Sequence, residues 1–506
     1  MSAARVKQTR VSLVRVGILL VAILVMAAGV RWIMAPGLAV APTPEASVFA
    51  GYVDVTATPT YQFEAPADSP QSNVILAFIV AGKENPCEPT WGTYYSMDAA
   101  ATQLDLDRRI AQLRSIGGDV SVSFGGQIND ELAVVCRNVD ALTDAYASVV
   151  DRYTLSSIDL DIEGPALADI AALERRAQAI AALQAEAVAG GRELQVWLTL
   201  PVATQGLTAE GVAAVEATLA GGVDIAGVNG MTMNFGGSKS AGQSMAGAVE
   251  DAASALHRQV VAAYAGRGIG LDGEQAWRKV GITPMIGQND LPGEVFTLDD
   301  AAAVNTFALE NGVGLLSMWS LNRDATCTSP LPKTVPVVQT SCSGIDQDGR
   351  SFADVLANGA DVAVAEPSAS GAAQSQVDPV VVDDPDTSPF PIWDPVGTYP
   401  AGTRVVWKRE VYRAKYWTSG ISPDTPQSTE ESPWTLVGPV LPGDKPAPLP
   451  TLPANTYPTW KAKSVYNKGQ RVQVGRVPYE AKWWTQGQPP GEPVAGGSPW
   501  VLVSPG

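Results

Sequence analysis

Three carboxylates recur at two-residue spacing in the segment SSIDLDIEG, residues 156–164: Asp159, Asp161 and Glu163. In a β-strand, residues two apart point to the same face, so this spacing predicts a row of carboxylates along one side of a strand. The residues between them are isoleucine or leucine and give the other side an apolar surface that can pack under helices. Because like charges repel and burial removes their hydration, such a row indicates a functional role.

Neighbouring carboxyl groups do not all ionise easily, so we expect a shared proton and a raised pKa at the outermost group, Glu163. A carboxylic acid that keeps its proton near neutral pH can protonate the leaving oxygen of a glycosidic bond. A solvated edge strand and a divalent-metal cluster are the alternatives. The apolar face argues against the first, and the lack of a further carboxylate at a matching strand end argues against the second.

Strand-like and helix-like segments alternate along the first two thirds of the chain. From about residue 48 to 325, short β-rich runs are separated by alanine-rich helical stretches, which predicts an α/β fold with a parallel sheet closed into a (β/α)₈ TIM barrel. Reactive groups of such barrels gather at the carboxyl ends of the strands, where Glu163 ends the fourth run. A doubly wound open sheet is the alternative, but no glycine-rich phosphate loop follows the first run. The runs are 48–55, 74–81, 119–125, 157–163, 194–201, 228–235, 280–286 and 313–321.

Charge and composition exclude several classes of function. The 506 residues carry a formal net charge of −18, which argues against a nucleic-acid partner and permits a neutral substrate. The single histidine, His257, argues against histidine-rich metal sites and histidine-based triads. The cysteines lack C-x-x-C spacing, so we expect no metal and no cofactor. Nothing indicates a protein partner, and we expect a monomer.

The N-terminus predicts export. Basic residues precede the apolar run VGILLVAILVMAAGV, residues 16–30, as in a signal peptide. We assign residues 1–35 to a signal peptide or an N-terminal membrane anchor, and residues 36–47 to a linker. A small-x-small pattern at Ala39 and Ala41 is followed by Pro42, which hinders cleavage. Secretion to the extracellular space and retention at the membrane both stay open.

An exported chain favours disulfide bonds over free thiols. Cys87, Cys136, Cys327 and Cys342 allow three pairings, and we favour Cys87–Cys136 with Cys327–Cys342, which joins sequence neighbours. Buried free thiols are the alternative.

The C-terminal part contains two similar small segments. Residues 357–390 are rich in Ala, Ser, Pro and Asp and read as a disordered linker. The segments 398–420 and 465–487 repeat each other at an offset of 67, within predicted all-β modules 391–440 and 457–506 that a proline-rich linker, 441–456, separates. Flat aromatic rings can stack on sugar faces. The candidates are Tyr416, Trp417, Trp483 and Trp484, whereas Trp434 and Trp500 are expected in the module cores.

Several motifs together resemble glycoside hydrolase family 18, the chitinases. The run IDLDIEG resembles the family's D-x-x-D-x-D-x-E signature, with Ser156 in place of its first Asp. The run SFGG (123–126) is similar to its S-x-G-G motif, MTMNFG (231–236) to its sixth-strand M-x-Y-D region, and Trp319 to its eighth-strand Trp. These motifs span residues 48 to about 350, so we assign 48–356 to a family 18 catalytic barrel. The modules resemble carbohydrate-binding modules of families 5 and 12, whose signature includes AKWWTQG.

The resemblance implies a role for each matching residue. Glu163 would protonate the leaving oxygen while the substrate's own N-acetyl oxygen attacks the anomeric carbon. Asp161 would orient the acetamido group, and Asp159 would tune Asp161. Trp319 would form the floor beneath the sugar, its alternative being an ordinary barrel-core residue. The S-x-G-G residues Ser123, Gly125 and Gly126 are expected to pack and leave room for the carboxylates.

The sixth strand departs from the family pattern. Where the family has a Tyr–Asp pair, this chain has Met233–Asn234. We expect Met231, Met233 and Asn234 to line the substrate site, with Asn234 able to hydrogen-bond a sugar but not to carry a charge.

The resemblance implies a secreted endo-chitinase that binds chitin or chitooligosaccharides. A non-hydrolytic chitin-binding lectin and an endo-β-N-acetylglucosaminidase acting on N-glycans are the alternatives; the acid at Glu163 argues against the first and the paired modules against the second. The short connection between the seventh and eighth strands, about 287–312, leaves room for one helix only. It predicts a cleft open at both ends and cleavage inside chains.

Overall fold

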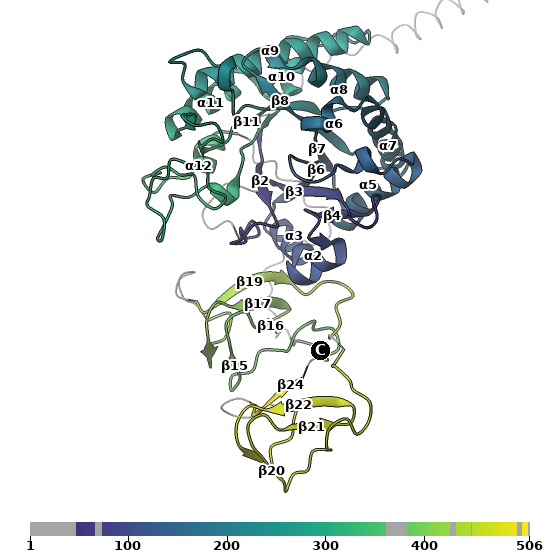
Figure 1. Cartoon of the computed structure of the whole chain (residues 1–506), viewed down its shortest axis with the longest axis vertical. Coiled ribbons are helices and arrows are strands. Elements are labelled where there is room, and N and C mark those ends of the chain that lie inside the picture. Colours follow the sequence, from purple (N-terminus) through teal and green to yellow (C-terminus); the bar gives the residue numbers. More distant parts are fainter. Residues whose placement is uncertain are drawn as a thin grey trace, which may run out of the picture. The chain divides into compact units, whose positions relative to one another are not determined.

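Parallel strands close into a ring in the N-terminal part of the chain (Figure 1). The computed structural model describes residues 47–65, 73–360, 382–425, 432–446, 448–492 and 498–503. The strands are β1 (Val48–Phe49), β2 (Gly51–Asp54), β3 (Asn73–Ala81), β6 (Asp119–Gly125), β7 (Ser157–Asp161), β8 (Gln195–Ala203), β10 (Gly227–Met231), β11 (Val280–Thr283) and β14 (Leu315–Leu316). β1 and β2 are consecutive pieces separated by Ala50: β1 pairs in parallel with the last strand of the ring, β14, and β2 pairs with β3. From β3 to β14, each strand of the ring pairs in parallel with the next one along the chain. The result is a TIM-barrel-like fold.

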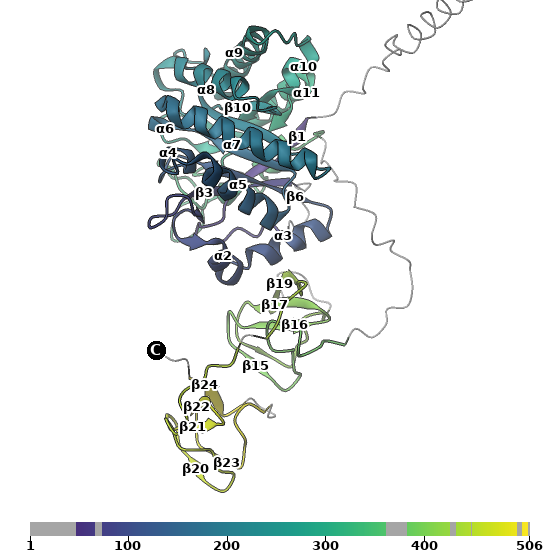
Figure 2. The ribbon, with the colours of Figure 1, turned by 90° about the vertical axis from the view of Figure 1, so that its right-hand side faces the viewer.

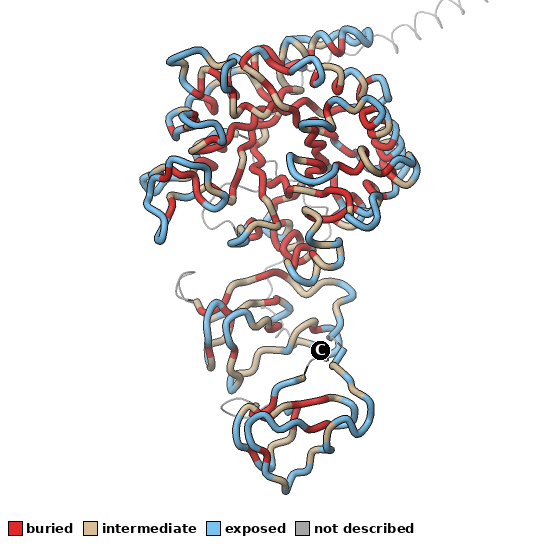
Figure 3. Tube along the Cα trace, in the orientation of Figure 1, coloured by how far each residue is buried: buried red, intermediate tan, exposed pale blue. Residues whose placement is uncertain are grey.

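Helices cover the outside of the ring, and their alanine- and leucine-rich faces pack on the strands (Figure 2). Figure 3 shows the burial of the strands and the exposure of the outer helical faces. A second apolar cluster, which includes Tyr52, Ala77 and Leu315, has Trp319 packed against it. The helices are α2 (Met97–Gln103), α3 (Leu106–Ser115), α4 (Leu132–Val135), α5 (Val139–Tyr153), α6 (Gly164–Ala168), α7 (Ile170–Ala189), α8 (Ala209–Ala220), η1 (Gly236–Ser238), α9 (Met245–Gly266), α10 (Gly273–Arg278), α11 (Leu298–Asn311), η2 (Leu321–Arg323) and α12 (Phe352–Leu356).

Helix α7 illustrates how the sequence sets these elements. Its Ala, Leu, Glu and Arg residues are strong helix formers. Asp169 caps its start by accepting a hydrogen bond from the backbone N–H of Ala172 at 3.0 Å, and the helix ends at Gly190. Its buried face includes Leu173, Ile180 and Leu183, and α7 packs beside α5.

Short strands that pair in an antiparallel manner lie in the connections between the barrel strands and helices. They are β4 (Pro89–Trp91), β5 (Tyr95–Ser96), β9 (Gly206–Leu207), β12 (Gly287–Gln288) and β13 (Val295–Phe296). Between β11 and β14 the chain forms the β12–β13 hairpin and then the single helix α11. One helix was predicted there; the hairpin was not, because two-residue strands leave no periodic pattern to detect.

The two C-terminal repeats have the same strand order, which fits small all-β modules. The first contains β15 (Thr398–Tyr399), β16 (Arg404–Trp407), β17 (Glu410–Ala414), β18 (Thr418–Ser419) and β19 (Trp434–Pro439). The second contains β20 (Val465–Tyr466), β21 (Arg471–Val474), β22 (Val477–Ala481), β23 (Thr485–Gln486) and β24 (Trp500–Leu502). The two-stranded sheet β15–β18 of the first repeat corresponds to β20–β23 of the second, and the three-stranded sheet β16–β17–β19 corresponds to β21–β22–β24.

Trp434 and Trp500 are buried in their modules, as predicted. Each ring meets a tyrosine edge-on, and each indole N–H donates to a backbone carbonyl, at 2.9 Å and 2.8 Å. Part of the expected linker is packed as well: Phe390 lies against Val406, Val411 and Val437 of the first module. The first module therefore has packed residues before position 391.

The structure contains both favoured disulfides, Cys87–Cys136 and Cys327–Cys342. The predicted signal or anchor segment and most of the predicted linker lie outside the described residues. Among the helices that the structure describes, none combines the length and apolar character of a membrane span.

Candidate active site

The three carboxylates of the SSIDLDIEG segment lie in and just after β7. Asp159 and Asp161 are 2% and 4% exposed, whereas Glu163, two residues beyond the strand, is half-buried. Glu163 precedes α6 without making a side-chain capping bond, so its carboxyl group is not committed to the helix. The row thus runs from the buried interior of the barrel to its carboxyl-terminal mouth.

Asp159 is held by three hydroxyl groups from three other strands. Ser123 and Tyr52 donate to its Oδ2 at 2.6 Å and 2.9 Å, and Thr199 donates to its Oδ1 at 2.6 Å. Burial raises the pKa of Asp159 to about 6, and these hydrogen bonds oppose the rise. Ser123 was expected to be a packing residue only; its hydroxyl proves to be a direct partner of Asp159.

Asp161 is buried without full hydrogen bonding. Its Oδ1 has no partner in the described part of the chain. Burial raises the pKa of Asp161 well above its usual range, and the charges of Glu163 and Asp159 add to the rise. Its backbone is closely packed, because a Cβ at Gly125 (φ +111°) would lie 2.0 Å from the Asp161 carbonyl oxygen. Burial and the neighbouring charges therefore favour the protonated form of Asp161, and its Oδ1 is left without a partner among the described residues.

A fourth carboxylate, which the sequence did not reveal, acts on Glu163 through its charge. Burial raises the pKa of Glu163, and the charge of Asp290, from the turn between β12 and β13, raises it further. Asp290 lies seven residues beyond the end of β11, in a hairpin turn that the strand pattern does not cover.

Asn234 binds Asp290. Its Nδ2 donates to Asp290 Oδ2 at 2.8 Å, and its Oδ1 accepts the Asp290 backbone N–H at 2.9 Å. The buried Glu294 carboxylate accepts hydrogen bonds from the backbone N–H groups of Phe235 and Gly236, the two residues that follow Asn234. Both the Nδ2 and the Oδ1 atom of Asn234 are thus hydrogen-bonded to the protein itself. The predicted contact of Asn234 with a sugar stays a prediction.

Met231 and Met233 follow Asn229 at two-residue spacing at the end of β10 and are half-buried. Asn229 is fully buried and donates to Thr199 at 3.0 Å and to Tyr52 at 3.3 Å. By strand alternation, Met231 shares the face of Asn229, which is the face of the Asp159 network. Met233 lies beyond the strand, where its backbone N–H donates to the Met231 carbonyl oxygen at 2.9 Å.

Trp319 is half-buried at the end of the eighth strand and packs on two aromatic rings. Its ring stacks on Phe78 at a centroid distance of 5.5 Å and lies 6.0 Å from that of Tyr52, whose hydroxyl binds Asp159. Its backbone N–H donates to Pro284. The barrel therefore brings Trp319 beside the carboxylate network, with part of the ring exposed.

Sequence reasoning missed Tyr52, Thr199, Asn229 and Asp290. The first three lie on strands, and the two-residue alternation that found the carboxylates could have marked them as inward-facing polar residues. Asp290 lies in the turn of the β12–β13 hairpin, a position that leaves no periodic signal in the sequence.

In the modules, the predicted sugar-stacking rings are exposed. Trp417 and Trp484 are 63% and 59% exposed, and Tyr416 and Trp483 are 49% and 45% exposed. Lys482 Nζ lies 4.7 Å from the centre of the Trp483 ring. These rings do not belong to the module cores.

The barrel and its site resemble known proteins. The chain is 39% identical over 284 residues to a probable bifunctional chitinase/lysozyme of Escherichia coli (strain K12), covering 55% of this chain and 31% of the relative. Endochitinase 11 of Metarhizium anisopliae is 37% identical over 284 residues, covering 55% of this chain and 52% of the relative. The crystal structure of the catalytic domain of a hyperthermophilic chitinase from Pyrococcus furiosus matches with a TM-score of 0.52 at 27% identity, covering 63% of this chain and 95% of that one. The barrel is similar to chitinase catalytic domains.

These similarities support a glycoside hydrolase and the resemblance to family 18. The chain spans about a third and about half of the lengths of the two curated relatives. No protein-family model matches it. Within its described residues, the chitinase-like chain has no group of three or more His, Cys, Asp or Glu side chains placed to hold a metal ion.

Proposed function

We propose that this protein is a secreted chitinase that hydrolyses internal β-1,4 linkages of N-acetylglucosamine polymers. The observation that carries the proposal is the pair formed by Glu163 and Asp161: a half-exposed acid with a raised pKa beside a buried carboxyl group with an unpartnered oxygen. Their place at the mouth of a barrel similar to chitinase catalytic domains supports it.

The proposed reaction is retaining and substrate-assisted. Glu163 gives its proton to the glycosidic oxygen as the bond from that oxygen to the anomeric carbon breaks. The acetamido oxygen of the same sugar forms a bond to the anomeric carbon, and the Oδ1 of Asp161 orients the acetamido N–H. Glu163, now ionised, then takes a proton from the water that opens the ring and restores the acid.

Asp159 supports Asp161 electrostatically. Because the pKa of Asp159 is about 6 and that of Asp161 is well above its usual range, Asp159 carries the charge of the pair near neutral pH while Asp161 keeps a proton. The three hydroxyl donors around Asp159 stabilise that charge. As positive charge develops on the acetamido group, the proton can be shared between the two aspartates.

The modules and disulfides support a polymer substrate outside the cell. Exposed ring pairs in both modules suit stacking on an insoluble chain, as in carbohydrate-binding modules of families 5 and 12. Two disulfides suit an exported protein, and one of the similar proteins is a fungal endochitinase.

The test compares substrates and follows the product anomer. The full-length protein is incubated with colloidal chitin, with chitohexaose and with an N-glycosylated protein. We expect soluble N-acetylglucosamine oligosaccharides from chitin, and β-anomers as the first products of chitohexaose by proton NMR. Release of N-glycans with chitin untouched would favour an endo-β-N-acetylglucosaminidase, and chitin binding without any product would favour a lectin; either result contradicts the proposal.

A further inference from the structure

Arg323 is a buried cation without an ion-pair partner in the described residues. It ends η2, four residues after Trp319, and is 2% exposed. Its guanidinium donates from Nη2 to the Gln288 carbonyl oxygen at 2.6 Å, from Nε to that of Gln339 at 2.7 Å and from Nη1 to that of Trp319 at 3.4 Å. Burying a charge is expensive, and here backbone carbonyls alone receive its hydrogen bonds.

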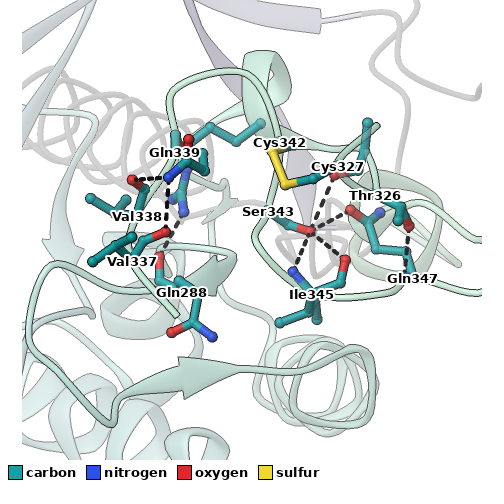
Figure 4. The surroundings of a disulfide bond; sticks show 12 residues. Gln288, Thr326, Cys327, Val337, Val338, Gln339, Cys342, Ser343, Ile345 and Gln347 are labelled. Carbon is teal, nitrogen blue, oxygen red and sulfur yellow. Dashed lines mark hydrogen bonds between the residues drawn. A yellow bond between two sulfur atoms is a disulfide. The ribbon is translucent and has the colours of Figure 1, made fainter. Parts of the chain in front are cut away.

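These three carbonyls belong to three different segments of the barrel mouth. Gln288 ends β12, Trp319 ends the eighth strand, and Gln339 lies in the loop that the Cys327–Cys342 disulfide closes. Figure 4 shows Gln288 and Gln339 near this disulfide. The Arg323 side chain therefore binds the backbone of Trp319, the backbone of the hairpin that carries Asp290, and the disulfide-closed loop.

The disulfide-closed loop also holds the other side of the Gln288 peptide. The Gln288 backbone N–H donates to the Ser343 carbonyl oxygen at 2.8 Å. The backbone of Gly287 also lies close to this carbonyl, because a Cβ at Gly287 (φ +64°) would lie 2.0 Å from the Ser343 oxygen. With Arg323 on its carbonyl and Ser343 on its N–H, Gln288 is fixed at both of its backbone polar groups.

Gln288 lies two residues before Asp290, the carboxylate that acts on Glu163. We infer that Arg323 is a positioning residue, which holds the β12–β13 hairpin through Gln288 and so fixes where the hairpin turn places the charge of Asp290 relative to Glu163, and which fixes the backbone of Trp319. An effect of Arg323 on catalysis rests on the proposed function, in which Glu163 is the acid. The effect of Arg323 on the position of Asp290 does not depend on that proposal.

The electrostatics agree with this placement. Burial lowers the pKa of Arg323 to about 10, and the charge of Asp290 opposes the fall. The charged groups that interact electrostatically with Glu163 are Asp161, from β7, and Asp290, from the β12–β13 hairpin; Asp159 acts on Asp161, and Asp290 also acts on Arg323. Because Asp290 raises the pKa of Glu163, releasing the hairpin should lower that pKa.

The experiment titrates Glu163 directly, without substrate. Full-length protein labelled with ¹³C at glutamate side-chain carboxyl carbons is titrated by NMR, and Glu163→Gln assigns the signal. Asp290→Asn should lower the pKa of Glu163 by about one unit, the size expected for loss of one nearby charge. Arg323→Met should lower it in the same direction by at least half as much, and the double variant should show no shift beyond that of Asp290→Asn.

Arg323→Lys separates position from charge. Lysine keeps the charge but, as a single ammonium group, does not reproduce the planar three-nitrogen contact, so its pKa shift should resemble that of Arg323→Met. The matched control is Lys333→Met, which removes a cation from the same disulfide-closed loop at a side chain that is 72% exposed. It should leave the pKa of Glu163 unchanged.

Two results would overturn the inference. One is a folded Arg323→Met protein in which the pKa of Glu163 stays within about 0.2 units of the wild type; the other is a double variant in which the two shifts add. If Arg323→Met does not fold, Cys327→Ser with Cys342→Ser releases Gln339 instead, and it must lower the pKa of Glu163 for the inference to stand. Failure of the chitin assay would refute the proposed function and leave these titrations interpretable.

Discussion

The Asp161 side chain is the least satisfied group in the candidate site. Its buried Oδ1 has no hydrogen-bond partner within the residues that the structure describes, and the charges of Glu163 and Asp159 act on its carboxyl group. Both features destabilise the folded protein. Proteins retain such groups where a ligand supplies the missing partner. The acetamido N–H of an N-acetylglucosamine unit is a donor of the required kind.

Asp161→Asn should change how stability depends on pH. The pKa of Asp161 is raised in the folded protein, so its protonated form contributes stability that is complete below the unfolded pKa, about 4, and is lost as pH rises toward the folded pKa. The variant removes this loss. We expect its free energy of unfolding to exceed that of the wild type by about 1–3 kcal/mol at pH 8 and by less at pH 4, measured by urea denaturation. A constant difference across this range would show that Asp161 does not titrate above its usual pKa.

Individual site residues differed in how far sequence could predict them. The spacing of the three carboxylates is typical of a strand, and the structure places Asp159 and Asp161 on β7 and Glu163 two residues beyond its end. Asp290 lies in the turn of the β12–β13 hairpin, where Asn234 binds it, and its charge acts on Glu163. Such contacts between distant segments leave no local pattern in the sequence.

Among the elements, the connection between β11 and β14 decides the form of the proposed cleft. It consists of the β12–β13 hairpin and the helix α11, with no further subdomain in residues 287–314. A barrel mouth without an added wall can admit the middle of a polymer chain and release it after each cut.

The measurement for this open cleft is the viscosity of a soluble chitin derivative during hydrolysis. Cleavage inside chains shortens the polymer early, so viscosity should fall to half while only a few per cent of reducing ends have appeared. Processive release from chain ends would do the opposite. A product dominated from the start by disaccharide, with viscosity nearly unchanged, would contradict an open cleft.

The barrel strands were predictable because they combine continuous apolar runs with alternating helices, and seven of the predicted runs overlap strands of three or more residues. The eighth run is different. Its regular strand is only Leu315–Leu316, although Trp319 continues the pairing through a bridge to Met285. The irregular end of this strand follows from its contacts with the loop after β11, which the apolar pattern does not encode.

In the whole molecule, the barrel and the modules have separate cores. The helix α12 belongs to the barrel, because Phe352 and Leu356 are fully buried in its core and Asn305 donates to the Leu356 carbonyl oxygen at 2.7 Å. The barrel therefore extends to about residue 360, slightly beyond the predicted boundary. The modules are built around their own Tyr–Trp pairs.

Removing the modules should separate catalysis from attachment. A chain ending at residue 360 should hydrolyse chitohexaose at a rate within about twofold of the full protein, but should lose about tenfold of its activity on crystalline chitin, since tethered modules raise only the local concentration. A chain ending at residue 440 should be intermediate. As a matched control, Trp417→Ala with Trp484→Ala in the full chain should reproduce the loss on crystalline chitin. Equal activity of all forms on that substrate would refute attachment by the modules.

The most direct measurement of the central claim is the activity of Glu163→Gln on chitohexaose beside its binding to chitin. Glutamine keeps the size of the side chain but has no acidic proton to give to the leaving oxygen, so hydrolysis should fall by about 100- to 10,000-fold while binding to colloidal chitin stays unchanged. Activity within about tenfold of the wild type, a barrier change of only about 1.4 kcal/mol, would show that another group is the acid and contradict the account.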